Sequence, residues 1–176
     1  MNKLLLYSAL LLLTQCSKCK KDDPAPVDQL PPATQTGAGT FGCLVNGQAW
    51  TPQGNDGSSN YTVSYDRSYR DGTLNVVAYR YGRNALDDQV VGVASDSLKT
   101  TGAFRIETRG RHSAGFVNRR TCRYDTTDSL TYSRGQLVIT RLDPVMGVVS
   151  GTFWFTLHKP GCDTIRVTNG RFDRKL

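Results

Sequence analysis

The chain has 176 residues, 17 of them glycine, and a formal net charge of +7. That length allows one domain with its own core once the first 40 residues are set aside, and it excludes two domains of ordinary size. Fifteen of the 18 basic residues after Thr40 are arginine. A moderate positive charge of this kind is typical of a solvated surface, so we expect no nucleic-acid partner.

The first residues have the pattern of an export signal. A positive charge at Lys3 precedes an apolar run over residues 4–13, which is shorter than the roughly 20 residues of a membrane-spanning helix. The run ends in Leu13-Thr14-Gln15-Cys16, which resembles a bacterial lipobox. The resemblance implies a signal peptide over residues 1–15 and lipidation of Cys16, which would anchor the protein to a membrane of the cell envelope, expected to be the outer membrane. The alternatives are an ordinary signal peptide or a buried helix.

Residues 16–40 are predicted to be a flexible tether. Four of the seven prolines fall in this stretch, and Thr, Gly and Ala follow them, so little apolar surface is available to order it. Cys16 and Cys19 have the spacing of a redox pair, but the charged, proline-containing sequence behind them is unlike the helix that follows such a motif. We therefore expect no redox site here, and a single folded domain over residues 41–176.

From Phe41 onward the sequence predicts strands separated by turns every 8 to 12 residues. Asn46-Gly47 is a strong signal for the first hairpin, and one short helix is expected near residues 84–89. This spacing favours an all-β fold, an antiparallel β-sandwich, with a closed or partly open β-barrel as the alternative. The predicted strands cover residues 41–45, 49–51, 61–65, 74–81, 89–94, 104–109, 115–118, 136–140, 149–157 and 163–174.

The strongest local signal is a hairpin formed by residues 136–140 and 149–157. Alternation along its second strand places Phe153 and Phe155 on one face, and Trp154 and His158 on the other. A hairpin with an aromatic face is not stable alone in water, so we expect a second layer to cover it.

Both ends of the predicted domain carry short recognisable segments. The opening is Phe41-Gly42-Cys43-Leu44-Val45-Asn46-Gly47, and the closing segment is Val167-Thr168-Asn169-Gly170-Arg171-Phe172-Asp173. Together with the lipobox, they resemble a family of uncharacterised lipoproteins from Bacteroidota. The resemblance implies a small lipid-anchored β domain, and it brings no known activity and no catalytic residues.

The three cysteines of the domain are predicted to play two roles. Cys43 shares a strand face with Phe41 and Val45, so we expect a buried thiol. Cys122 and Cys162 lie in polar segments on either side of the central hairpin, near strand ends, and export makes disulfides permissible. We predict a disulfide between them, with two unpaired loop thiols as the alternative.

Few residues offer catalytic chemistry. The two histidines, His112 and His158, are interpreted as surface residues, and no hydrolase, zinc-protease, phosphate-loop or calcium-loop motif is present. Asp125 and Asp128 could pair as general acid and base or bind calcium, as could Asp87 and Asp88. Close carboxylates in such loops are more typical of turns, so an enzyme is disfavoured and we expect no cofactor and no metal site.

Arginines are concentrated between residues 105 and 123, with a single acidic residue, Glu107, among them. Guanidinium groups suit phosphate and carboxylate, which makes an acidic glycan or a lipopolysaccharide a candidate ligand. The alternative is a solvated sheet face. The candidate binding residues are Arg105, Arg109, Arg111, Arg119 and Arg120, and a tyrosine platform for sugars could add Tyr61, Tyr65, Tyr69, Tyr79 and Tyr81.

The sequence thus predicts a lipid-anchored envelope module that has a binding or structural role. Two other functions stay open: an envelope hydrolase that uses Asp125 and Asp128, and a lipid-carrying barrel with a cavity under Phe153 and Phe155.

Overall fold

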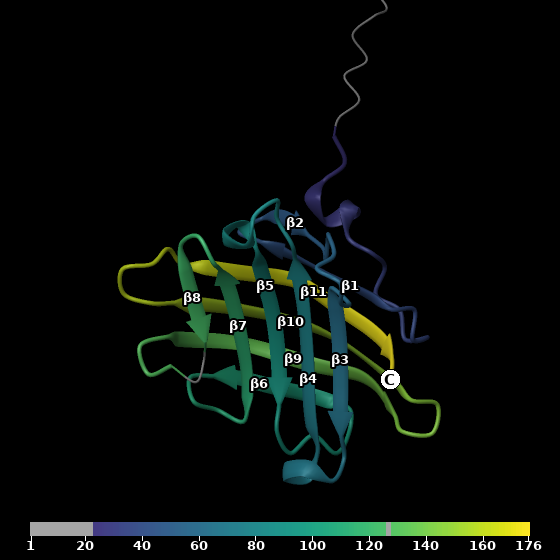
Figure 1. Ribbon diagram of the computed structural model, residues 1–176. Coiled ribbons are helices and arrows are strands. Elements are labelled where there is room, and N and C mark those ends of the chain that lie inside the picture. Colours follow the sequence, from purple (N-terminus) through teal and green to yellow (C-terminus); the bar gives the residue numbers. More distant parts are fainter. Residues whose placement is uncertain (1–22, 126–127) are drawn as a thin grey trace, which may run out of the picture.

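The computed structural model describes residues 23–125 and 128–176, and within these residues the chain forms two antiparallel sheets packed face to face (Figure 1). The predicted β-sandwich is therefore confirmed. The barrel alternative is wrong, because each sheet ends in strands with one free edge, β2 and β6 in one sheet and β3 and β8 in the other.

The six-stranded sheet has the order β2-β1-β11-β10-β9-β6. Its strands are β1 (Thr40–Val45), β2 (Gln48–Trp50), β6 (Gly102–Glu107), β9 (Tyr132–Asp143), β10 (Val148–His158) and β11 (Ile165–Lys175). The predicted central hairpin is β9 and β10, which lie in the interior of this sheet.

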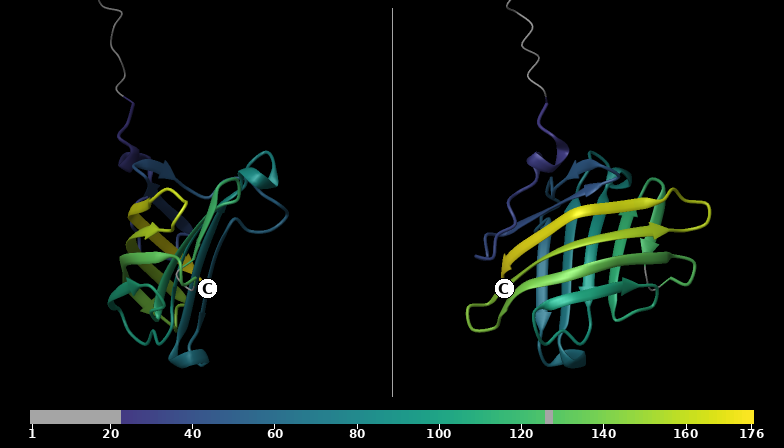
Figure 2. Two further views of the ribbon diagram at one scale, coloured as in Figure 1. Left: turned by 90° about the vertical axis from the view of Figure 1, so that its left-hand side faces the viewer. Right: turned by 180° about the vertical axis from the view of Figure 1, so that it is seen from behind.

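The five-stranded sheet has the order β3-β4-β5-β7-β8. Its strands are β3 (Tyr61–Asp66), β4 (Thr73–Arg80), β5 (Gln89–Ser95), β7 (His112–Asn118) and β8 (Cys122–Asp125), and short 3-10 helices occupy η1 (Pro26–Gln29), η2 (Tyr69–Asp71) and η3 (Ala85–Asp87). The helix expected near residues 84–89 is thus a single turn, η3. The side views in Figure 2 show the two layers diverging towards the end at which β2 and η3 lie.

Aromatic side chains fill the space between the sheets. The Phe41 ring contacts the rings of Tyr61 and Phe153 at centroid distances of 5.5 and 5.6 Å, and the Phe153 ring stacks on that of Phe155 at 6.0 Å. Burial of each ring stabilises the fold by about 1.5–3 kcal/mol. A Cβ at Gly170 would collide with the Phe153 ring, so glycine is required where the two strands approach closely. This dense packing does not favour a lipid cavity under Phe153 and Phe155.

The first hairpin has the tight turn that its sequence predicts. Asn46 and Gly47 have φ values of 49° and 83°, the two positive values of a type I′ turn, and β1 pairs with β2 on either side. Cys43 lies in β1 with no exposed surface and no disulfide partner. The predicted buried thiol is confirmed, and burial raises its pKa to about 12.

Residues 30–38 pack against the six-stranded sheet, and we call them the N-terminal strap. Leu30 is only 7% exposed, and Thr34 and Ala38 both donate hydrogen bonds to the buried carboxylate of Asp173, at 2.6 and 3.0 Å. The prediction of a flexible tether is therefore wrong for residues 30–38, because a carboxylate far along the chain binds their polar groups. Cys16 and the predicted signal peptide lie outside the described residues.

Candidate functional site

The outer face of the six-stranded sheet presents an exposed tryptophan among polar and basic side chains. Trp154 is 40% exposed and Tyr132 is 60% exposed. On β6, β9, β10 and β11 the residues that alternate with the buried ones point away from the core. We define the Trp154 face as Arg105, Tyr132, Arg134, Gln136, Trp154, His158 and Arg166.

The strand register orders this face into two rows. In the first row Trp154 on β10 lies opposite Gln136 on β9, and Gln136 lies opposite Arg105 on β6. In the second row Thr156 lies between Arg134 and Arg166, and Glu107 on β6 lies opposite Arg134 on its other side. Neighbouring strands are about 4.8 Å apart, so roughly 10 Å separates the Cα atoms of Arg105 and Trp154 in the first row, and those of Arg134 and Arg166 in the second.

The second row carries positive charge that other side chains leave available. Arg105 forms an ion pair with Glu107 at 2.9 Å. Neither Arg134 nor Arg166 forms an ion pair with a carboxylate in residues 23–125 and 128–176. The face can therefore offer two guanidinium groups beside an aromatic ring, which is suited to a ligand with acidic groups and flat apolar surface.

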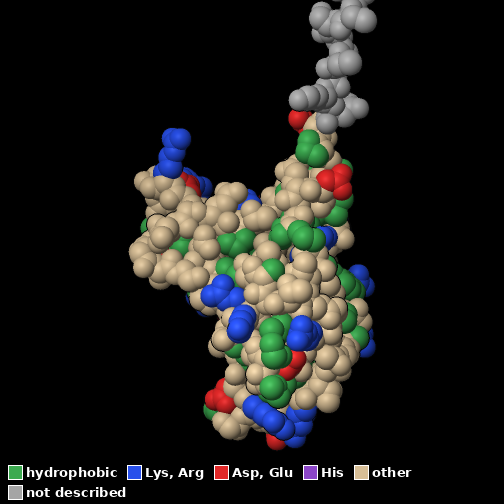
Figure 3. All heavy atoms as spheres, turned by 90° about the vertical axis from the view of Figure 1, so that its right-hand side faces the viewer, with side chains coloured by type: hydrophobic (Ala, Val, Ile, Leu, Met, Phe, Trp, Pro, Cys, Tyr) green, Lys and Arg blue, Asp and Glu red, His purple; other side chains and the backbone are tan. Residues whose placement is uncertain are grey.

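The five arginines predicted to bind a ligand do not form one site. Arg109 and Arg111 lie in the turn between β6 and β7, whereas Arg119 and Arg120 follow the far end of β7 and pair with Asp88 and Asp87. The length of β7 separates the two groups by roughly 25 Å, and of the five only Arg105 belongs to the Trp154 face. Figure 3, a view from the side of the C-terminus, shows basic side chains interspersed with hydrophobic ones on that side of the molecule.

The tyrosines are not one platform either. Tyr61 is buried in the core, and Tyr65 donates a hydrogen bond to the Leu98 carbonyl at 2.7 Å. Tyr79 and Tyr81 stack on each other at 5.6 Å. Tyr69 is exposed in η2.

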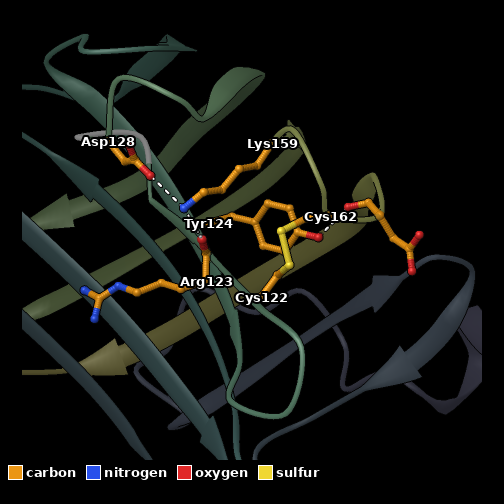
Figure 4. The surroundings of a disulfide bond; sticks show 7 residues. Cys122, Arg123, Tyr124, Asp128, Lys159 and Cys162 are labelled. Atoms are coloured by element: carbon orange, nitrogen blue, oxygen red, sulfur yellow. Dashed lines mark hydrogen bonds and ion pairs between the residues drawn. A yellow bond between two sulfur atoms is a disulfide. The ribbon is translucent and has the colours of Figure 1, made fainter.

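The carboxylates considered for catalysis are each bound to a cation. Asp128 accepts a hydrogen bond from Lys159 Nζ at 2.8 Å, which is the main reason why the pKa of Asp128 is below its usual range (Figure 4). Asp125 lies 3.6 Å from the Arg123 guanidinium, and the hydrogen bond from Arg120 lowers the pKa of Asp87. A general acid at neutral pH needs a raised pKa, whereas the pKa values of Asp87 and Asp128 are shifted in the opposite direction.

A disulfide joins Cys122 on β8 to Cys162 in the loop between β10 and β11, with the Cα atoms 6.2 Å apart (Figure 4). The predicted pairing is confirmed, and it links the two sheets because β8 and β10 belong to different layers. Tyr124 on β8 donates a hydrogen bond to the Asp163 carbonyl beside it.

Sequence reasoning placed Trp154 on the strand face opposite Phe153 and Phe155 but did not identify Arg134, Gln136 or Arg166 as its neighbours. The sequence does contain one signal, the alternation of Tyr132, Arg134 and Gln136 with buried residues along β9. The contribution of Arg166 depends on strand order, which alternation alone does not reveal.

Further observations concern metals, membranes and relatives. The described residues contain no cluster of three or more His, Cys, Asp or Glu side chains able to hold a metal ion. In the same part of the chain, no helix has the length and apolar character needed to cross a membrane. No curated protein and no solved structure matches the chain significantly.

A family model does match, over residues 53–174, and its description is a domain of unknown function, DUF6252. The matched range includes every strand from β3 to β10, nearly all of β11, and the whole of the Trp154 face. The expected membership of an uncharacterised family is confirmed at this level. The chain belongs to the DUF6252 domain family.

Proposed function

We propose that this protein is a lipid-anchored binding module of the cell envelope that holds an acidic glycan on the Trp154 face. The observation that carries the proposal is the exposed Trp154 ring beside Arg134 and Arg166, two guanidinium groups that pair with no carboxylate among the described residues. Acyl chains on Cys16 would insert into the membrane directly, so the attachment needs no other partner.

The chemistry of the face corresponds to that of a charged sugar polymer. A sugar ring presents C–H groups on its faces and hydroxyl groups around its rim, so Trp154 can cover the first and Gln136 can hydrogen bond to the second. Guanidinium groups bind carboxylate, sulfate or phosphate through paired N–H donors. The two parallel rows suit an extended ligand, whether an acidic polysaccharide or the saccharide part of a lipopolysaccharide.

The location of the N-terminal strap agrees with this role. The strap crosses one end of the same outer face, where Arg171 and Arg141 donate hydrogen bonds to the carbonyls of Pro31 and Gln35 at 3.2 and 2.6 Å. The Trp154 face lies farther along the same strands, beyond the strap. Both the anchor segment and the binding surface therefore belong to one side of the sandwich.

Retention on immobilised dextran sulfate and polygalacturonate, with neutral dextran as the uncharged matrix, tests the proposal. The Arg134→Ser/Arg166→Ser variant should bind the acidic matrices at least about tenfold more weakly at low salt, and Trp154→Ala should weaken binding by a similar factor. The loss should shrink as ionic strength rises, because screening weakens the parent's charge contacts too.

The matched control is Arg67→Ser/Arg83→Ser, which removes two exposed arginines from the loops after β3 and β4, in the other sheet, and the same net charge. This control should bind as the parent does. Equal weakening in both double variants would mean that only net charge matters, and the assignment to the Trp154 face would be wrong.

A further inference from the structure

The diverging end of the sandwich contains a cleft that is distinct from the Trp154 face. Its volume is about 430 Å³, within the range of small-ligand sites. Side chains from both sheets line it, and the Cys122–Cys162 disulfide forms part of its wall. The lining residues that matter below are Asn46, Gln89, Phe116, Asn118, Tyr124 and Asp163.

Three amide side chains in this cleft have their oxygen atoms occupied. The Trp50 indole donates to Gln89 Oε1 at 2.8 Å, linking β2 to β5 across the two layers. The backbone N–H of Arg166 donates to Asn46 Oδ1 at 2.8 Å, and that of Arg120 donates to Asn118 Oδ1 at 3.1 Å. Because each oxygen accepts a hydrogen bond, the orientation of each side-chain amide is determined, and its other terminal atom is the NH₂ nitrogen.

The three amide nitrogens retain their donors. In residues 23–125 and 128–176, neither Gln89 Nε2 nor the Nδ2 atoms of Asn46 and Asn118 donate to a protein acceptor. Gln89 and Asn118 lie opposite each other in the β5–β7 ladder, on the same inner face as Phe116. Both are partly buried and Asn46 is exposed, so the three NH₂ groups are accessible to the oxygen atoms of a ligand.

The rest of the lining limits what the acceptor can be. Phe116 and Tyr124 are 3% and 2% exposed and close the floor of the cleft. The exposed Asp163 adds a negative charge, and no Lys or Arg is among the described residues that line the cleft. An anion would meet no cation here and would be repelled by Asp163, whereas a wholly apolar ligand would leave the amides without partners.

We propose that this cleft binds one neutral sugar ring. The amides of Asn46, Gln89 and Asn118 donate to ring and hydroxyl oxygens, and the Asp163 carboxylate accepts from a hydroxyl. The inference does not depend on the Trp154 face, which lies on the outer side of the other layer and is suited to acidic groups.

Trp50 provides an internal reporter, because its indole N–H is bound to Gln89. The chain has two tryptophans, so in the full-length Trp154→Phe variant the tryptophan fluorescence, excited at a wavelength that tyrosine does not absorb, comes from Trp50 alone. Titration with glucose, galactose, mannose and N-acetylglucosamine should give a saturable fluorescence change for at least one of them. No saturable change with any of the four would overturn the proposal, and saturable binding of acetate in their place would do the same.

Acid-for-amide substitutions then test the three donors. Gln89→Glu, Asn46→Asp and Asn118→Asp keep the oxygen that accepts the structural hydrogen bond and replace only the donor group. Each should weaken sugar binding about tenfold, the effect of one lost hydrogen bond from the amide donor. Asn75→Asp, on the outer face of β4, is the matched control and should leave binding unchanged.

Side-chain amide NMR signals give a second measurement that does not depend on the stability of the variants. In the parent, added sugar should shift the NH₂ signals of Asn46, Gln89 and Asn118 and leave those of Asn75 and Asn84 in place. Shifts spread evenly over all five amides would show non-specific binding and contradict the assignment. The two proposals can be tested separately, because variants of the Trp154 face should lose binding to acidic polymers and keep binding to the sugar.

Discussion

Among single residues, Asp173 is notable because its carboxylate is buried and accepts several hydrogen bonds. Its carboxylate has no exposed surface, and it accepts hydrogen bonds from Ser150 Oγ at 2.6 Å and Thr34 Oγ1 at 2.6 Å. The backbone N–H groups of Gly37 and Ala38 add two more, at 2.8 and 3.0 Å. Burial alone would raise the pKa of Asp173, but these donors outweigh it and hold the pKa well below its usual range.

We expect Asp173→Asn to lower the free energy of unfolding by about 3 kcal/mol at pH 7, because the amide cannot accept this set of donors. The folded-state pKa is depressed, so the contribution of the charge is complete above pH about 4, the ordinary aspartate pKa, and is lost as the pH falls below it. Urea unfolding of parent and variant at pH 7, 5 and 3 checks this, since the difference between them should shrink only at the lowest pH.

Asp66→Asn is a suitable control for Asp173, because Asp66 is exposed and its hydrogen bonds stay within its own turn, with Ser68 and Tyr69. The control should change stability by less than about 0.5 kcal/mol at every pH. A difference between parent and Asp173→Asn that stays constant down to pH 3 would show that the charge state of Asp173 does not contribute.

At the scale of elements, local patterns predicted some strands and missed others. The Asn46-Gly47 turn and the alternation along β10 determine their own geometry, so both hairpins could be predicted from short stretches. β8 is a four-residue edge strand with sequence CRYD, and it is defined by pairing with β7 rather than by its own composition. The strap was missed for the same reason, because its partner Asp173 is more than 130 residues away.

The candidate site also combines features that a short stretch of sequence predicts with features that depend on the pairing of distant strands. The outward direction of Trp154 could be predicted from a period of two, whereas its neighbours Gln136 and Arg105 depend on the register between three strands. The available N–H groups of Asn46, Gln89 and Asn118, in the cleft at the diverging end of the sandwich, could not be predicted at all. They depend on which hydrogen bonds the amide oxygens already accept.

The disulfide is the element-scale feature with the clearest consequence for stability. Cys122 and Cys162 are 40 residues apart in the chain, so the chain-entropy model gives a contribution of about 4 kcal/mol. We expect Cys122→Ser/Cys162→Ser to lose roughly this free energy of unfolding in urea, and dithiothreitol to destabilise the parent by a similar amount. Dithiothreitol should not affect the double variant, and a parent that is equally stable with and without it would contradict the prediction.

For the whole molecule, the expected behaviour is that of a domain attached to a membrane at one end. A positive start, an apolar run over residues 4–13 and a cysteine directly behind it motivate this expectation. We expect Cys16→Ser to move the protein from the membrane fraction to the soluble fraction, with loss of fatty-acid labelling. Cys19→Ser, three residues further on, is the control and should remain in the membrane fraction. Labelling that persists in Cys16→Ser would show that another residue carries the lipid.

The contact between the strap and Asp173 also determines how the domain responds to mechanical force. A load applied at the N-terminal end of the described chain reaches residues 34–38 before it reaches β1. Several donors of the strap converge on a single carboxylate, so a load on the strap is transmitted to Asp173. Tension applied at that end is therefore carried first by β11 in the interior of the sheet, before it reaches β1.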